Sequence, residues 1–98
     1  MKVVLSRRAI IEIQEIGDYI AQDNPERAAY FVRELRTACL TLVEMPFAFP
    51  IVQRYADHEV RRRLHGNDVV LYRVEVDANR IVVLNVLHGA SDYLQTDL

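Results

Sequence analysis

The strongest constraint on the fold of this chain is a β-branched run near its end. Residues 80–87 have the sequence Arg-Ile-Val-Val-Leu-Asn-Val-Leu. A short run so rich in valine and isoleucine favours a buried strand. It stops at His88-Gly89, where a glycine favours a sharp change of direction. The sequence therefore predicts a last strand that places a polar corner at the edge of a small sheet.

Two more strands are predicted before this one, at residues 58–64 and 69–76. The connections at residues 65–68 and 77–79 contain Gly, Asn and Asp, which favour the turns of β-hairpins. A short apolar segment at residues 2–5 predicts a further strand at the beginning of the chain.

Between the first strand and the last three, apolar residues recur every three or four positions, which predicts two amphipathic helices. Ser6 is the expected N-cap of the first helix, which ends near residues 22–23. Asn24 caps the second, and Pro25 suits its first turn because no N–H is needed there. This helix is expected to continue to about residue 44. A joint this short makes the two helices an antiparallel hairpin.

These elements predict one α+β domain over residues 1–98, with the order β-α-α-β-β-β and the helical hairpin on one face of an antiparallel sheet. Side chains alternate between the two faces of a strand. The face expected to meet the helices consists of Val70, Tyr72, Val74, Val76, Val82, Leu84, Val86 and His88. The opposite face is expected to be open, polar and cationic, with Arg61, Arg63, Arg73 and Asn85.

Charge and composition narrow the class of partner. The formal net charge is −2, and 11 of the 12 basic residues are arginine. Proteins that bind a phosphate backbone usually carry a basic excess, so the balance favours a protein partner over nucleic acid. A single cysteine excludes an intrachain disulfide. No segment approaches the roughly 20 apolar residues of a membrane span, and we expect a cytoplasmic protein with no membrane association.

The order and spacing of three motifs resemble the RelE/ParE superfamily of toxins from type II toxin–antitoxin systems. The motifs are residues 19–25 (Tyr-Ile-Ala-Gln-Asp-Asn-Pro), residues 71–74 (Leu-Tyr-Arg-Val) and residues 86–89 (Val-Leu-His-Gly). The resemblance covers essentially the whole chain. Its long helical hairpin and balanced charge are more similar to the ParE branch than to the RelE branch.

The resemblance implies a toxin that inhibits DNA gyrase without catalysis and is neutralised by a cognate antitoxin. The antitoxin would be ParD-like, with a ribbon-helix-helix domain and a disordered tail, and DNA would be contacted only through it. Arg61, Arg63, Arg73 and Asn85 are the residues that we expect to bind the antitoxin. The run at residues 61–63 is equally consistent with charges that protect an edge strand from pairing.

Two other functions remain open. The RelE branch cleaves messenger RNA on the ribosome, and such chemistry needs cations and proton carriers. The candidates here would be Arg61, Arg63, Arg73, His88 and Tyr93. The third possibility is an inactive homologue that acts only as antitoxin partner and transcriptional co-repressor.

Several conspicuous side chains have a simple structural interpretation. We expect His88 to be a hydrogen-bonded corner residue and Cys39 to belong to the core. Tyr19 and Tyr30 are expected to pack between the helices. His58 and His65 have no carboxylate or thiol at metal-binding spacing, so neither a metal nor a cofactor is predicted.

Overall fold

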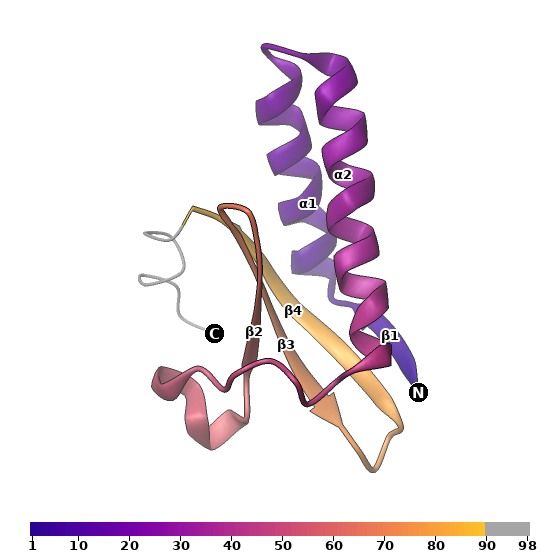
Figure 1. The fold of residues 1–98 in the computed structure, drawn as a ribbon, viewed down its shortest axis with the longest axis vertical. Coiled ribbons are helices and arrows are strands. Elements are labelled where there is room, and N and C mark those ends of the chain that lie inside the picture. The colour runs from indigo at the N-terminus through magenta and orange to yellow at the C-terminus, as the bar shows by residue number, and fades with distance from the viewer. Residues whose placement is uncertain (90–98) are drawn as a thin grey trace.

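Four strands form one sheet in the order β1-β4-β3-β2, and a long helical hairpin packs on one face of it (Figure 1). The computed structural model describes residues 1–89. The tip of the hairpin projects beyond the end of the sheet. The elements are β1 (Lys2–Leu5), α1 (Arg7–Ala21), α2 (Pro25–Leu40), η1 (Thr41–Glu44), η2 (Gln53–His58), β2 (Arg61–His65), β3 (Asp68–Glu75) and β4 (Arg80–His88). Within these 89 residues, no helix has the length and apolar character needed to cross a membrane.

The predicted fold class and order of elements are confirmed, with one difference in the sheet. β2, β3 and β4 form an antiparallel meander, as their two short turns require. β1 pairs with β4 in parallel, so the sheet is mixed. A parallel neighbour needs a long crossover connection, which the helical hairpin and the two meander turns supply.

Local signals in the sequence explain the hairpin. The Ser6 side chain accepts a hydrogen bond from the N–H of Ala9 at 3.0 Å, and the Asn24 side chain accepts one from the N–H of Arg27 at 3.0 Å. These caps satisfy amides that a helix start leaves without partners. The helices approach closely at Gly17, where a Cβ atom would lie 2.7 Å from Cγ2 of Val32.

Two boundaries differ from the prediction. The α-helical part of α2 ends at Leu40, and the chain tightens into the 3₁₀ turn η1, where continuation of the helix to residue 44 was expected. β2 begins at Arg61, because residues 53–58 form the 3₁₀ segment η2. Glu59, with φ of 53°, then turns the chain into the strand.

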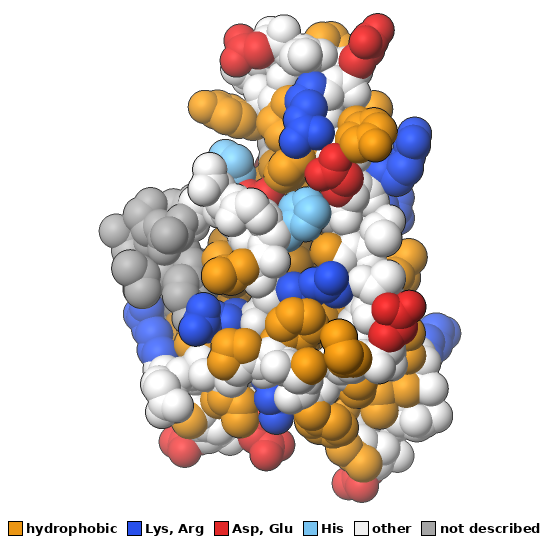
Figure 2. Space-filling model, in the orientation of Figure 1, with side chains coloured by type: hydrophobic (Ala, Val, Ile, Leu, Met, Phe, Trp, Pro, Cys, Tyr) orange, Lys and Arg blue, Asp and Glu red, His pale blue; other side chains and the backbone are white. Residues whose placement is uncertain are grey.

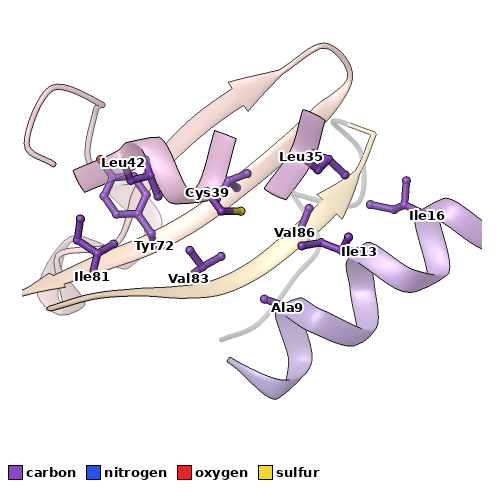
Figure 3. Close-up of a cluster of buried hydrophobic side chains, with 11 residues drawn as sticks. Ala9, Ile13, Ile16, Leu35, Cys39, Leu42, Tyr72, Ile81, Val83 and Val86 are labelled. Atoms are coloured by element: carbon purple, nitrogen blue, oxygen red, sulfur yellow. The ribbon is translucent and has the colours of Figure 1, made fainter. Parts of the chain in front are cut away.

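The main core lies between the hairpin and the sheet (Figure 3). Side chains from both helices point at the same face of the sheet. Cys39 is fully buried there, as expected. The buried residues of this core are Ala9, Ile13, Ile16, Leu35, Cys39, Leu42, Val70, Tyr72, Ile81, Val83 and Val86.

The opposite face of the sheet is not the open polar surface that was predicted. A second buried cluster covers it, made of Val52, Val60, Val69, Leu71 and Leu87. The segment that includes η2 supplies two of these residues and therefore covers this face with apolar side chains.

A β-bulge changes the faces of β4. The register shifts between Leu71 and Tyr72, which pair with Asn85 and Val83, so Leu84 is an extra residue in β4. Alternation restarts after a bulge. Ile81 and Val83 therefore face the helices, and Leu84 packs in the second cluster. The prediction was right for Val86 and wrong for Val82 and Leu84, because a strict period of two ignores the extra residue.

Candidate functional site

Arg61 and Arg63 lie on the helical side of the sheet. They pair with Tyr72 and Val70, whose side chains are in the main core. Nη1 of Arg61 donates to the carbonyl oxygens of Phe47 at 3.2 Å and Phe49 at 2.7 Å. Its guanidinium also lies 5.3 Å from the centre of the Phe47 ring. Arg61 therefore holds the aromatic loop after η1, residues 46–50, against the sheet.

Arg63 holds the end of α2 against the sheet in a similar way. Its Nη1 donates to the carbonyl oxygen of Ala38 and to Oγ1 of Thr41, both at 2.8 Å. A cation is favourable at this position because the last carbonyls of a helix carry partial negative charge. The guanidinium lies 5.0 Å from the centre of the Phe49 ring. Neither set of contacts was predicted from the sequence.

A cavity of about 340 Å³ opens between α2 and β2. Figure 2 shows this face of the molecule, on which acidic, histidine and basic side chains follow one another. Its lining residues include Tyr30, Arg33, Glu34, Thr37, Arg63 and His65. We refer to it below as the α2–β2 groove.

The carboxylate of the α2–β2 groove is already paired. Glu34 Oε1 lies 3.3 Å from Nη1 of Arg27, and Oε2 lies 3.4 Å from Nε2 of His65. His65, which was expected in a turn, is the last residue of β2, and its ring meets the edge of Phe31. These contacts hold the end of the β2–β3 hairpin against α2.

Arg73 is separated from the other two arginines. Its Nη2 lies 2.8 Å from Oε2 of Glu75, and Nε of Arg80 lies 2.5 Å from Oε1 of the same carboxylate. The hydrogen bonds from Arg80 and Arg73 lower the pKa of Glu75 below its usual value. The predicted grouping of Arg61, Arg63 and Arg73 on one face is therefore wrong, because the first two bind carbonyls on the helical side.

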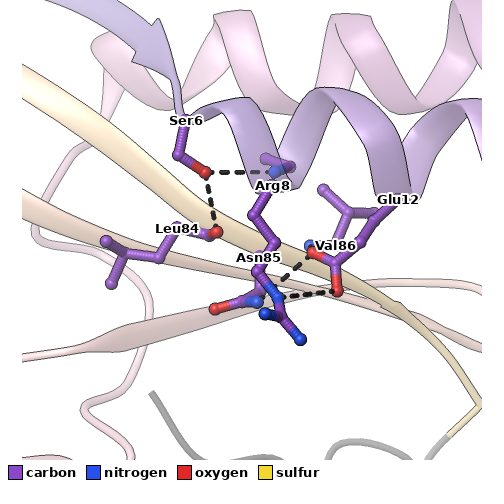
Figure 4. Close-up of polar contacts among 7 residues, drawn as sticks. Ser6, Arg8, Glu12, Leu84, Asn85 and Val86 are labelled. Atoms are coloured by element: carbon purple, nitrogen blue, oxygen red, sulfur yellow. Dashed lines mark hydrogen bonds and ion pairs between the residues drawn. The ribbon is translucent and has the colours of Figure 1, made fainter.

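Asn85 is buried at the edge of β4, with 4% of its surface exposed (Figure 4). Its Nδ2 donates to Oε1 of Glu12 at 3.3 Å, and the N–H of Val86 donates to the same oxygen at 3.0 Å. Ser6 Oγ donates to the carbonyl oxygen of Leu84 at 2.8 Å. The side chains of Ser6 and Glu12 thus supply hydrogen-bond partners to the part of β4 that extends beyond the end of β1.

The electrostatics of Glu12 reflect this position. Burial raises the pKa of Glu12 above the usual glutamate value, although the hydrogen bonds from Val86 and Asn85 act in the opposite direction. Arg8 lies 3.8 Å from Oε2, but 73% of its side chain is exposed, so water screens this pair.

His88 is a hydrogen-bonded corner residue, as expected. Its Nδ1 lies 2.6 Å from Oδ1 of Asp68, which is 1% exposed. Oδ2 of Asp68 has no hydrogen-bond partner within residues 1–89. The ring centres of His88 and Tyr19 are 5.9 Å apart. Tyr93, the remaining candidate, lies outside the described residues.

The α2–β2 groove was not predicted from the sequence. Tyr30, Glu34 and Thr37 recur at spacings of four and three, which places them on one face of α2 beside its apolar stripe, and Thr41 continues this spacing at the C-cap. That period was the available signal. Tyr19 and Tyr30 are 63% and 58% exposed, so the expectation that they pack between the helices was wrong.

Within residues 1–89, no three His, Cys, Asp or Glu side chains gather closely enough to hold a metal ion. The residues around the α2–β2 groove instead provide positioned hydrogen-bonding and charged groups, beside a strand in which Leu64 is the exposed residue.

Comparisons with known proteins agree with this architecture. The family model of the ParE toxin of the type II toxin-antitoxin system, parDE, matches residues 3–93. A chain of the chromosomal ParDE system from P. aeruginosa has a similar structure, with a TM-score of 0.76 and 18% identity over 91% of this chain and 96% of that one. A chain of the RelBE2 toxin-antitoxin complex from Mycobacterium tuberculosis is also similar, with a TM-score of 0.63 and 18% identity over 89% of this chain and 95% of that one. A comparison with curated proteins found no match.

Proposed function

Because the chain belongs to the family of ParE toxins of type II toxin–antitoxin systems, we propose that it inhibits DNA gyrase and that a cognate antitoxin neutralises it. The observation that carries this proposal is the family match over residues 3–93, which includes every described strand and helix except the first residue of β1. The antitoxin would be ParD-like, and contact with DNA would be indirect, through the antitoxin. The toxin would act in the cytoplasm.

The state of the arginines supports a mechanism without catalysis. Metal-free cleavage of RNA needs cations that can stabilise the charge on a crowded phosphate. Arg61 and Arg63 instead donate to carbonyl oxygens, and Arg73 is paired with Glu75. A carboxylate in that position would repel a phosphate. The net charge of −2 also disfavours entry into a polyanionic ribosomal site.

The test combines two assays on the purified protein. We expect it to inhibit DNA supercoiling by gyrase and to leave messenger RNA intact on translating ribosomes. Addition of the antitoxin should restore supercoiling. Messenger cleavage without inhibition of gyrase would refute the proposal, and inactivity in both assays with antitoxin binding intact would identify an inactive partner and co-repressor.

One observation favours a ribonuclease as the second candidate. The buried carboxylate of Asp68 lies 2.6 Å from Nδ1 of His88, and 45% of the histidine side chain is exposed. A carboxylate that fixes one ring nitrogen leaves the other free for proton transfer. If this function were correct, His88→Ala would reduce cleavage by about 100-fold or more, while Tyr19→Ala, which removes only the ring contact, would have a much smaller effect.

A further inference from the structure

The outer edge of β2 is paired over only part of its length. The N–H of Arg62 donates to the carbonyl oxygen of Pro50 at 3.0 Å, and the N–H of Val52 donates to that of Val60 at 2.8 Å. In an antiparallel strand, every second residue directs both backbone groups to the same neighbour. The backbone groups of Val60 and Arg62 point away from β3, so those of Leu64, two residues further on, point away as well.

Pairing along this edge stops at a proline. Pro50 accepts the bond from Arg62 but has no N–H to donate in return. Within residues 1–89, no backbone group outside β2 pairs with Leu64, whose surface is 60% exposed. An exposed strand edge with unpaired N–H and C=O groups is a template for another strand.

The α2–β2 groove lies beside this open edge and is basic. Arg33 and Arg63 both line it. Glu34 is the one acidic residue among its lining residues, and its carboxylate is already paired with Arg27 and His65. A ligand with acidic side chains therefore complements this groove, whereas a basic ligand would meet unpaired positive charge.

We propose that β2 accepts an extended acidic segment of the antitoxin as a fifth strand, whose side chains alternately face the α2–β2 groove. This inference rests on the proposed function, because it identifies the partner as the antitoxin. Main-chain hydrogen bonds at Leu64 supply affinity, and acidic residues facing Arg33 supply specificity.

The other edge of the sheet is less suited to this role. Lys2 and Ser6 direct their N–H groups to carbonyls of the β4 region, so the backbone N–H groups of Val3 and Leu5 point outward from the free edge of β1. Both of these residues are half-buried and pack against the main core. A strand added there would meet apolar side chains rather than an arginine-lined groove.

A proline at Leu64 tests the edge directly. Leu64→Pro removes the outward N–H and leaves the β2–β3 hydrogen bonds intact, because prolines are tolerated at such edge positions. Leu64→Ala is the matched control, since it loses the same side chain but keeps the N–H. We expect Leu64→Pro to bind the antitoxin at least about tenfold more weakly than Leu64→Ala. Equal affinities would overturn the inference.

Charge and amide protection give independent measurements. Arg33→Glu is expected to weaken antitoxin binding by roughly tenfold, and Arg7→Glu, the same change on an exposed part of α1, by less than about threefold. In the wild-type complex, hydrogen exchange should slow at Leu64 by at least about 100-fold.

The outcomes separate the inference from the proposed function. Slower exchange at Val3 and Leu5 without a change at Leu64 would place the added strand on β1 and refute the inference alone. Loss of binding in Arg7→Glu as large as in Arg33→Glu would exclude the groove as the source of specificity. Failure of the wild-type protein to bind the antitoxin at all would refute the proposed function and the inference with it.

Discussion

Glu12 offers the sharpest test of what holds α1 to the sheet. Oε1 of this carboxylate is the acceptor for both the N–H of Val86 and the amide of Asn85, and both donors belong to buried residues. Glu12→Ala would leave two buried donors without partners, at a cost of about 1–3 kcal/mol each. We expect the free energy of unfolding to fall by about 3 kcal/mol, which lowers Tm by roughly 12–24 °C for a domain of this size.

Glu12→Gln should behave differently. The glutamine oxygen can accept both hydrogen bonds, and no charge has to be buried. The pair with exposed Arg8 contributes little. We therefore expect the unfolding free energy of Glu12→Gln at pH 7 to lie within about 0.5 kcal/mol of the wild-type value.

The dependence of the unfolding free energy on pH gives a further test of the role of Glu12. Because burial raises the pKa of Glu12 in the folded protein, its protonated form is favoured by folding. This contribution is fully present below the unfolded pKa and is lost as pH rises through the higher folded value. Relative to Glu12→Gln, the wild type should lose stability over that window, as measured by urea denaturation. A wild type that gained stability there, or a Glu12→Gln protein as unstable as Glu12→Ala, would refute the reasoning.

Two further predictions concern packing and the end of α2. Gly17→Ala should lower the unfolding free energy by about 1–3 kcal/mol in thermal denaturation, because the added Cβ would lie 2.7 Å from Val32 Cγ2; an unchanged Tm would show that the helices separate freely. Arg63→Ala should lower the unfolding free energy by about 1–3 kcal/mol in urea denaturation, because the hydrogen bond to the Ala38 carbonyl oxygen is lost. The matched control is Arg62→Ala on the same strand, which should cost less than about 0.5 kcal/mol because the Arg62 side chain makes no such hydrogen bond within residues 1–89.

The helical hairpin was predictable because its determinants are local. The Ser6 and Asn24 caps bond to amides three residues away, and the apolar stripes follow the helical period. The turns of the meander were also readable, since Gly66 and Asn79 have the positive φ that such residues favour. Interactions between neighbours in sequence fix these elements, and a pattern of residue types records them.

The positions of the arginines were not predictable in the same way. Arg61 and Arg63 bind chiefly carbonyl oxygens, which lie 12 to 25 residues away in sequence. A main-chain carbonyl is present at every residue, so no residue type marks it as a partner. The sequence shows the charges, and only the packing of α2 and the aromatic loop decides what they bind.

The opposite face of the sheet was mispredicted for two separate reasons. The bulge at Leu84 reverses the alternation of β4, and no residue type in the run announces it. Val52 and Val60 cover the face from positions on either side of the 3₁₀ segment η2, where apolar residues follow neither the helical nor the strand period. Both effects depend on contacts between distant parts of the chain.

The position of β4 in the sheet has a consequence for how the protein is made. β4 lies between β1 and β3, although it follows both in sequence, and Lys2 of β1 pairs with Arg80. While a ribosome is still synthesising the region before residue 80, β1 has no partner, and the β2–β3 hairpin lacks its central neighbour. Closing so long a loop is entropically costly and slow. The complete sheet and the helical core can therefore form only after β4 has been synthesised, so a partner that recognises the folded sheet cannot bind it before then.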